Sequence, residues 1–232
     1  MCGRYTIAKP ERVIAVFMPR IITADISRPR YNIAPMQDVP VIIGNAEARA
    51  LRNCQWGFVP GWASDPAIGN RMINARSETV AVKPAFRAAF RNGRCLVPAD
   101  GYYEWRKTRT GKQPVYIHPS DNEPMAFAGL YSSWSGNASS ANLLSCTILT
   151  READGWLAPV HDRMPVILPE ELWDSWADSA RPGEAILREI LDVPTGRGLV
   201  LTEVSTLVNS PAHDSKECVV PLADQLFPNG NS

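Results

Sequence analysis

A cysteine at the second position can do chemistry that no internal cysteine of the chain can do. The chain begins Met1-Cys2-Gly3-Arg4-Tyr5, and an initiator methionine is normally removed when the next residue is small. Removal would leave Cys2 with a free α-amine, whose pKa of about 7.7–8.0 keeps part of it neutral and nucleophilic near pH 7. Such an amine condenses with an aldehyde to an imine, and the adjacent thiol can then close a thiazolidine ring. Cys2 is therefore a candidate for covalent aldehyde capture; the alternative is an ordinary residue behind a retained or trimmed Met1.

Four other segments place polar or aromatic side chains beside apolar stretches. Residues 73–79 (INARSET) form a polar cluster, and residues 98–105 (PADGYYEW) set a carboxylate next to an indole after a predicted strand. Residues 161–165 (HDRMP) place an imidazole just before another predicted strand, and residues 56–62 (WGFVPGW) read as an aromatic loop punctuated by Gly and Pro.

Together these segments resemble the SRAP family (SOS response-associated peptidase), which includes the abasic-site sensor proteins of bacteria and eukaryotes. Five motifs carry the resemblance, in family order and over most of the chain: Cys2-Gly3-Arg4-Tyr5, Tyr31-Asn32-Ile33-Ala34-Pro35, Asn74-Ala75-Arg76, Glu104-Trp105 and His161-Asp162-Arg163. The resemblance implies an active site containing Cys2, Asn74, Glu104 and His161.

Each implied catalytic role agrees with the chemistry of the side chain. Glu104 could move protons at the amine and at the sugar oxygen if burial raises its pKa; the alternative is a surface carboxylate paired with Arg106 or Lys107. His161 titrates near neutral pH and could help open the cyclic abasic sugar, whereas a lone histidine is more often structural. Asn74 could hold the amine or a sugar hydroxyl, and its alternative is a turn or cap residue.

The resemblance also implies contacts with DNA. Arg4, Arg76 and Arg163 would hold phosphates, because an arginine fork matches phosphate oxygens. Trp62 and Trp105 could stack on bases, at about 1–3 kcal/mol per base, or could simply pack in the protein. By resemblance Pro35 lines the DNA path, and Thr150 adds a hydroxyl to the pocket. Two departures each remove a contact that some family members have: Trp62-Ala63 replaces two adjacent tryptophans, and Met164 stands where a second arginine could follow Arg163.

The function that the resemblance implies is covalent capture of abasic sites in single-stranded DNA. The Cys2 amine would attack the ring-opened aldehyde and the Cys2 thiol would close the ring, with β-elimination as a lyase side reaction and self-removal of Met1. One alternative is a cysteine peptidase or amidohydrolase with Cys2 as nucleophile and His161 as base. Another is a non-covalent single-strand DNA-binding module in which Cys2 is incidental.

Composition limits the partners that we expect. The 232 residues are 45% hydrophobic and carry 24 basic and 24 acidic residues, so a DNA contact must come from a local patch rather than from a global field. The five cysteines contain no Cys-x-x-Cys pair, which predicts neither a zinc site nor a disulfide framework. With no visible signal peptide and no apolar run of about 20 residues, we expect a cytoplasmic monomer without cofactor or metal.

Periodicity predicts an α+β fold, namely one domain over residues 1–232 with a curved, mostly antiparallel, barrel-like sheet and short flanking helices. We expect residues 222–232 to form a partly disordered tail, and Trp56, Trp173 and Trp176 to lie in the core. The predicted strands cover residues 39–43, 54–58, 94–97, 115–118, 125–131, 143–149, 165–168 and 199–204. The predicted helices begin at Pro10, Pro84, Pro169 and Glu184.

Overall fold

The structure is a computed structural model that describes residues 2–136, 142–194 and 198–223. Most of the tail that we expected to be partly disordered, residues 224–232, lies outside the described residues. The strands are β1 (Tyr5–Ile7), β2 (Ile21–Ile22), β3 (Arg30–Ile33), β4 (Asp38–Ile43), β5 (Ala50–Trp56), β6 (Asn74–Arg76), β7 (Arg94–Ala99), β8 (Gly101–Thr108), β9 (Gly111–Pro119), β10 (Met125–Trp134), β11 (Leu143–Glu152), β12 (Arg163–Pro165), β13 (Ile167–Leu168) and β14 (Leu199–Glu203). The α-helices are α1 (Pro10–Phe17), α2 (Arg87–Asn92), α3 (Trp173–Ala177) and α4 (Gly183–Asp192), and the 3₁₀ turns are η1 (Pro66–Arg71), η2 (Glu170–Leu172), η3 (Thr206–Asn209) and η4 (Lys216–Cys218).

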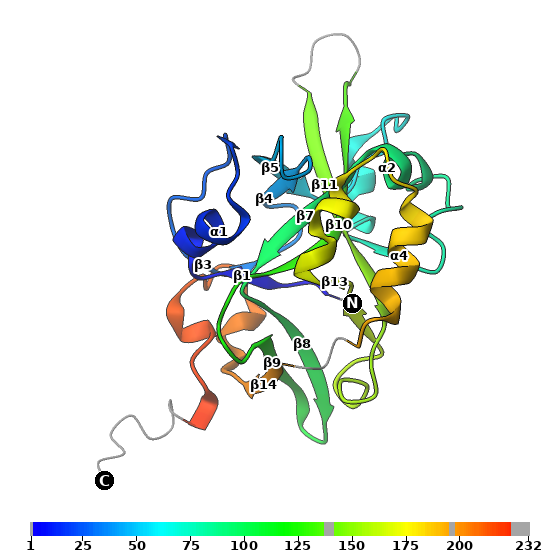
Figure 1. Cartoon of the computed structure of the whole chain (residues 1–232). Coiled ribbons are helices and arrows are strands. Elements are labelled where there is room, and N and C mark those ends of the chain that lie inside the picture. The colour runs from blue at the N-terminus through cyan, green and yellow to red at the C-terminus, as the bar shows by residue number, and fades with distance from the viewer. Residues whose placement is uncertain (1, 137–141, 195–197, 224–232) are drawn as a thin grey trace.

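The larger sheet closes on itself. Its strands follow the order β12-β11-β10-β7-β4-β5-β2, and an additional parallel pairing joins β11 to β5, so that β11, β10, β7, β4 and β5 form a closed ring. The other four pairings around the ring are antiparallel. Closure removes the unpaired sheet edges. The predicted α+β, mostly antiparallel, barrel-like fold is therefore confirmed (Figure 1).

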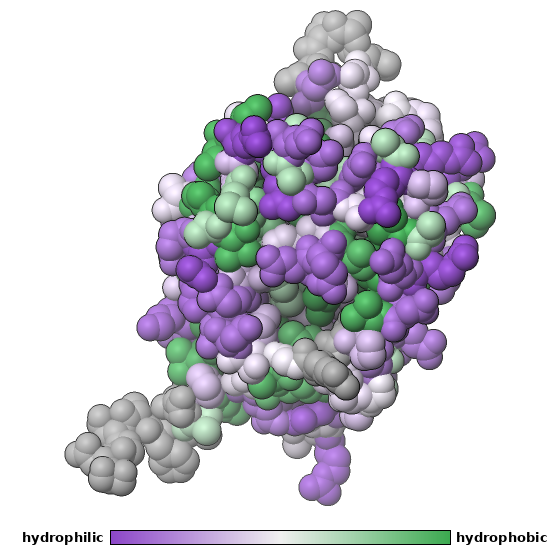
Figure 2. All heavy atoms as spheres, viewed as in Figure 1, coloured by the Kyte–Doolittle hydropathy of each residue, from purple (hydrophilic) through white to green (hydrophobic). Residues whose placement is uncertain are grey.

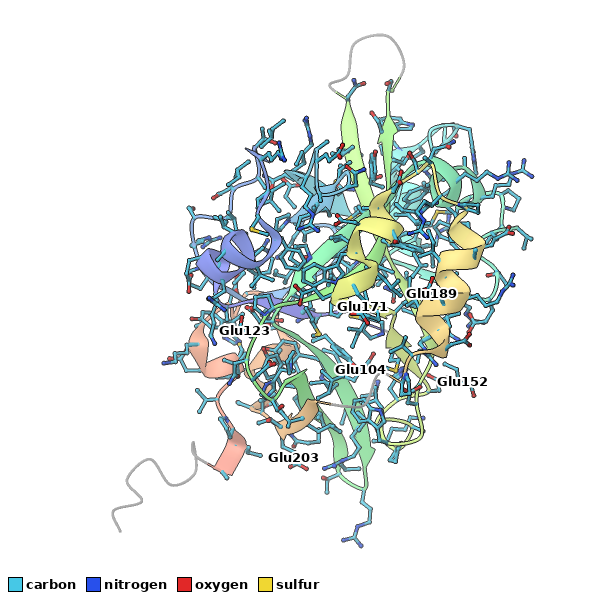
Figure 3. All side chains as sticks on the ribbon, in the orientation of Figure 1. Glu104, Glu123, Glu152, Glu171, Glu189 and Glu203 are labelled. Carbon is cyan, nitrogen blue, oxygen red and sulfur yellow. The ribbon has the colours of Figure 1, made fainter. Side chains whose placement is uncertain are left out.

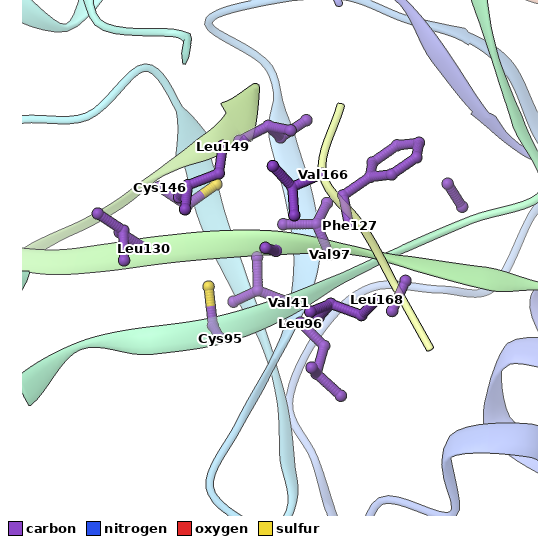
Figure 4. Packing of buried hydrophobic residues seen from close by; sticks show 14 of the residues in the cluster. Val41, Cys95, Leu96, Val97, Phe127, Leu130, Cys146, Leu149, Val166 and Leu168 are labelled. Atoms are coloured by element: carbon purple, nitrogen blue, oxygen red, sulfur yellow. The ribbon is translucent and has the colours of Figure 1, made fainter. Parts of the chain in front are cut away.

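A second sheet, in the order β14-β9-β8-β1-β3, packs beside the barrel (Figure 1). One cluster of buried hydrophobic side chains runs through both sheets and includes Tyr102 and Ile117 of the second sheet. Figure 4 shows part of this core, including Cys95 of β7, Leu130 of β10 and Cys146 of β11. The second sheet is therefore held on the barrel by shared apolar burial, the main stabilising term in folding.

Short helices cover the barrel where periodicity predicts them. Pro10 supplies the first turn of α1 and Phe17 is turned inward, where it stacks on Trp173 with ring centroids 4.3 Å apart. Trp173 and Trp176 are 4% and 0% exposed, and Trp56 is 0% exposed. The prediction that these three tryptophans are core residues is confirmed.

Several sequence predictions need correction. The helix expected to begin at Pro169 is a 3₁₀ turn, η2, followed by α3 from Trp173. The helix expected to begin at Pro84 begins at Arg87, because residues 83–86 form turns in which Phe86 N–H donates to the Lys83 carbonyl. The strand expected over residues 165–168 is two strands, since the chain changes partner at Val166: β12 pairs with β11 and β13 with β10. Two segments expected outside strands are also strands: β8 carries Glu104, and β6 carries Asn74.

Candidate active site

The register of β1 against β8 brings Cys2 next to Glu104. Tyr5 pairs with Tyr102, and the Tyr103 N–H donates to the Arg4 carbonyl at 3.0 Å. Because the strands are antiparallel, the chain that precedes Arg4 runs alongside Glu104 and the following residue of β8. Cys2 is 0% exposed, and both burial and the Glu104 carboxylate raise the pKa of its thiol. The Cys2 thiol therefore stays protonated at neutral pH.

Glu104 is a buried carboxylate and not a surface one. It is 2% exposed, and burial raises its pKa to about 7. The two alternative surface pairings are not made: Arg106 forms its ion pair with Glu203 of β14, two strands away in the sheet, and Lys107 is exposed. In Figure 3 the Glu104 side chain points from β8 toward the interior, whereas Glu203 lies at the outer edge of the sheet. A carboxyl group with a pKa near 7 can both accept and donate a proton at neutral pH.

His161 lies opposite Glu104, with its Nε2 atom 4.0 Å from Glu104 Oε2. Its Nδ1 atom accepts a hydrogen bond from the Arg163 N–H at 2.9 Å, so the neutral ring carries its proton on Nε2, the atom nearer Glu104. Asp162 Oδ1 is also 2.9 Å from Nδ1, a contact that becomes a hydrogen bond only when the imidazole is protonated. Burial lowers the pKa of His161, which favours the neutral ring with Nε2–H directed toward Glu104.

The burial of Glu104 predicts a pH dependence of stability. Its pKa rises from 4.5 to about 7 on folding, so the fold favours the protonated carboxyl. This contribution is complete below pH 4.5 and is lost as the pH rises through about 7. We expect the free energy of unfolding to fall by about 3 kcal/mol between these limits relative to Glu104→Gln, at about 1.36 kcal/mol per pKa unit. Urea unfolding of both proteins across this range measures the difference; parallel curves would contradict it.

A second group of predicted residues gathers where β6 and β12 flank β11. Asn74 pairs with Ile148 and Arg76 pairs with Thr150 along the parallel β6–β11 ladder. Arg163, on the other flank, donates to the Thr150 carbonyl at 2.7 Å. The Asn74 amide donates to the Ile73 carbonyl at 2.9 Å, and its Oδ1 atom is buried without a hydrogen-bond partner among the described residues. An unpaired buried acceptor costs free energy, so Asn74 is ready to accept a hydrogen bond from a bound group.

Arg163 is held by a carboxylate that the motifs did not single out. Its guanidinium makes a two-pronged contact with Glu78, at 2.6 Å to Oε1 and 3.0 Å to Oε2. This hydrogen bonding lowers the pKa of Glu78. The sequence marked the polar segment 73–79 that contains Glu78. It could not predict that Glu78 pairs with Arg163, which lies 85 residues further along the chain.

The remaining predicted residues lie around these two groups. The guanidinium of Arg4 donates to Asn32 Oδ1 at 2.9 Å and to the Val208 carbonyl at 2.7 Å, so it joins β3 to η3. The indole of Trp105 is half-buried and donates to Asn209 Oδ1 at 2.7 Å. Pro35 follows β3 in a turn and is half-buried.

Trp62 lies in a turn between β5 and η1. It is 64% exposed and lines a hollow of about 360 Å³ together with residues of α2 and the end of β10. The structure thus brings Cys2, Glu104 and His161 together and brings Asn74, Arg76, Thr150 and Arg163 together on β6, β11 and β12.

Tyr102 was missed by sequence analysis. It is 0% exposed and lies two residues before Glu104, on the same face of β8. Its hydroxyl has no hydrogen-bond partner among the described residues, and burial raises its pKa, with smaller contributions from Cys2 and Glu104. A tyrosine in a strand with apolar neighbours gives no signal that separates a site hydroxyl from a core ring.

No group of three or more His, Cys, Asp or Glu side chains in the described ranges could hold a metal ion. All five cysteines are free and buried. No helix among the described residues is long and apolar enough to span a membrane.

The chain that forms this barrel, with Cys2 shortly before β1, a buried Glu104 and a facing His161, matches a known family. Residues 1–211 match the model of the family described as SOS response associated peptidase (SRAP), and the chain belongs to this family. It is 36% identical over 223 residues to the protein named abasic site processing protein YoqW of Bacillus subtilis, covering 94% of this chain and 99% of that protein. It is 32% identical to the one named abasic site processing protein YedK of Escherichia coli, covering 76% and 79%.

Solved structures agree in fold. A protein from Bacteroides thetaiotaomicron superposes with a TM-score of 0.81 at 23% identity, over 95% of this chain and 100% of that one. A phage-related protein from Bordetella bronchiseptica gives a TM-score of 0.67 at 32% identity, over 88% and 94%.

Proposed function

We propose that this protein captures abasic sites in single-stranded DNA through a covalent bond to Cys2. The observation that carries the proposal is a buried Glu104, with a pKa of about 7, between the Cys2 thiol and the Nε2 atom of His161. Relatives named abasic site processing proteins support the choice of substrate. An abasic sugar in equilibrium with its open form supplies the aldehyde that an amino-terminal cysteine can trap.

The first step joins the Cys2 amine to the aldehyde. After removal of Met1, Glu104 takes a proton from the Cys2 ammonium, and the free amine adds to the C1′ carbonyl carbon. Glu104 then returns the proton to the departing hydroxyl, water leaves, and the protonated imine that forms gives its proton to Glu104, so that a neutral imine remains. A group with a pKa near the working pH serves both transfers, because neither its acid nor its base form is scarce.

The second step closes the ring. The Cys2 sulfur adds to the imine carbon and its proton passes to the imine nitrogen, so that no atom is lost and no oxidant is needed. The raised pKa of the Cys2 thiol agrees with addition of a protonated thiol with Glu104 as proton carrier. Cysteine peptidases need the opposite, a thiol whose pKa is lowered to favour the thiolate. The state of Cys2 therefore favours aldehyde capture over the peptidase alternative.

His161 is suited to the step before capture. Its neutral ring directs Nε2–H toward Glu104 and the space between them, where it can donate a hydrogen bond to the ring oxygen of the closed sugar while the protonated Glu104 carboxyl supplies the proton as the aldehyde forms. Asn74 Oδ1 is available to accept a hydrogen bond from a sugar hydroxyl or from the amine. If elimination at the imine outruns ring closure, the same intermediate gives strand cleavage, which is the lyase side reaction.

Arg76 and Arg163 are candidates to hold phosphates beside this group, and Glu78 competes for Arg163. Because a phosphate must share or displace the Glu78 carboxylate, we expect Glu78→Gln to tighten binding of single-stranded DNA by about threefold to tenfold at low salt. Fluorescence anisotropy with a labelled single strand measures this. The matched control is Glu123→Gln, which frees Arg12 from an equivalent surface ion pair. Unchanged affinity in Glu78→Gln, or equal gains in both variants, would contradict a phosphate role for Arg163.

The proposal is tested with an oligonucleotide that carries one abasic site. Protein whose mass shows loss of Met1 should give a slow, heat-resistant band on a denaturing gel, and its mass should equal protein plus DNA minus one water. The control is a protein with an amino-terminal extension that keeps the Cys2 nitrogen in an amide. A band of equal intensity from the extended protein, or no band from the processed one, overturns the proposal.

A further inference from the structure

We propose that the outer end of the β8–β9 hairpin is a basic arm that holds DNA phosphates on one side of the active site. The arm consists of Lys107, Arg109 and Lys112. The inference rests on the proposed function, since it names a further contact with the same DNA strand. It is carried by the charge, the pairing and the position of these three side chains.

The arm is a concentration of positive charge in a chain with no net charge. Residues 105–120 contain Arg106, Lys107, Arg109 and Lys112 and no Asp or Glu. Arg106 is neutralised by Glu203. In the described part of the chain, no carboxylate forms an ion pair with the three residues of the arm. All three are exposed, so this is a local positive patch of the kind that a neutral protein needs to bind a polyanion.

The pairing of the hairpin works against its own stability. Lys107 and Lys112 are direct cross-strand partners, and like charges directly opposite each other destabilise an antiparallel pair. The turn that joins the strands is otherwise well formed, because the Thr108 hydroxyl donates to the Gly111 carbonyl at 3.1 Å. A local conflict without a structural compensation marks a functional position. A bound phosphate would relieve the repulsion by lying between the two ammonium groups.

An aromatic side chain stands on the same face as the lysine pair. Along β8, Trp105 and Lys107 are two residues apart and therefore point to the same side of the sheet. The Trp105 indole is held by Asn209 and remains half-exposed. Proteins usually bind single-stranded nucleic acid with cations along its phosphate backbone and with aromatic rings on which the bases stack.

The arm lies close to the active site along β8. β8 carries Glu104 and then Lys107, so Lys107 lies about 10 Å further along the strand at about 3.4 Å per residue, with its side chain on the opposite face of the sheet. The outer end of the hairpin is only two strands wide, because β14 pairs with residues 115–119 of β9 and β1 with residues 101–102 of β8. Lys112 is near enough to His161 to contribute to the lowering of the histidine pKa, of which burial is the main cause. In Figure 1 the hairpin extends downward from the sheet, and Figure 2 shows a hydrophilic projection at the same place. A DNA strand that leaves the site at Glu104 can pass round this narrow end and meet the arm within a few nucleotides on one side of the lesion.

The test compares two double variants that remove the same charge. Lys107→Gln/Lys112→Gln removes the cross-strand pair. Lys9→Gln/Lys216→Gln is the matched control, since both of its lysines are exposed and lie beside Tyr116 and His118, at the end of β9 away from the arm. Binding is measured by fluorescence anisotropy at several salt concentrations. The probes are single strands that contain a tetrahydrofuran in place of the abasic sugar and extend only to its 5′ side, only to its 3′ side, or to both.

For the arm variant we expect about tenfold weaker binding to the two-sided probe at low salt, and a salt slope smaller by about 1.4, or about 0.7 for each lost phosphate contact. The loss should occur with one of the one-sided probes and not with the other. The melting temperature should stay the same or rise, because the lysine repulsion is gone. The control should change neither affinity nor slope.

Three results would overturn the inference: unchanged binding by the arm variant, equal losses by arm and control variants, or equal losses with both one-sided probes. A tetrahydrofuran has no aldehyde and forms no imine. Failure of covalent capture in the wild-type protein would therefore count against the proposed function alone. It would not affect the outcome of this binding test.

Discussion

We expect the Cys2→Ala variant to form no covalent product with abasic single-stranded DNA while it binds the same strand within about twofold of wild type. Alanine at this position keeps a free α-amine after Met1 is removed, but it lacks the thiol that closes the ring. An imine alone is reversed by water, so no band should survive heating on the gel. The expected loss is complete, because the five cysteines include only one whose nitrogen can become an amine.

The Cys2→Ser variant distinguishes formation of the carbon–nitrogen bond of the imine from formation of the carbon–sulfur bond that closes the ring. It should form an imine that borohydride reduces to a stable product, whereas without borohydride it should resemble Cys2→Ala. The wild-type product should not need borohydride. Cys218→Ala is the matched control, because it also removes a buried free thiol but lies outside the site. A heat-stable product from Cys2→Ala without reductant would exclude the thiazolidine and would direct attention to a lysine.

The second large effect is expected at Glu104. Glu104→Gln keeps the size of the side chain but removes its proton transfer, and we expect crosslinking to slow by about 100-fold or more, the usual range for loss of a general acid–base group. Binding of intact single strands should change little. The wild-type rate should rise as the pH increases through about 7, because Glu104 must be ionised to accept the ammonium proton.

Single-turnover crosslinking measured from pH 5 to 9 tests this role. The Glu104→Gln profile should lack the step near pH 7 and retain only the later rise from the α-amine, near pH 8. Glu189→Gln, an exposed change on α4, should follow the wild type. Equal losses of binding and rate in Glu104→Gln would count against proton transfer and for a structural role.

Much of the secondary structure could be predicted because it depends on neighbours in the chain. Val13 and Phe17 recur at the helical period behind Pro10, and α1 covers these residues. α4 (Gly183–Asp192) begins within a residue of the predicted start at Glu184. β8 was missed because Pro98, Asp100 and Gly101 are turn formers, whereas in the structure Gly101 begins a strand that pairs with both β1 and β9.

The closed barrel could not be predicted from local patterns. It depends on the parallel pairing of β5 with β11, in which Trp56 lies opposite Cys146, and such a contact leaves no periodic trace in either segment. The same holds for Asn74, which is a strand residue only because β6 finds β11. The entropy lost when a long loop closes is offset by burial of the whole core and not by the few residues that pair.

The sequence by itself identified the family and a candidate reactive group: five ordered motifs, whose family the match to residues 1–211 confirms, and a thiol beside a potential amine at Cys2. Only the tertiary structure decided whether the side chains around Cys2 are buried and how they are protonated. Glu104 could have been a surface carboxylate, but the β1–β8 register buries it beside Cys2 and raises its pKa to about 7. Side-chain type is a property of one residue, whereas burial and protonation are set by everything that packs around it.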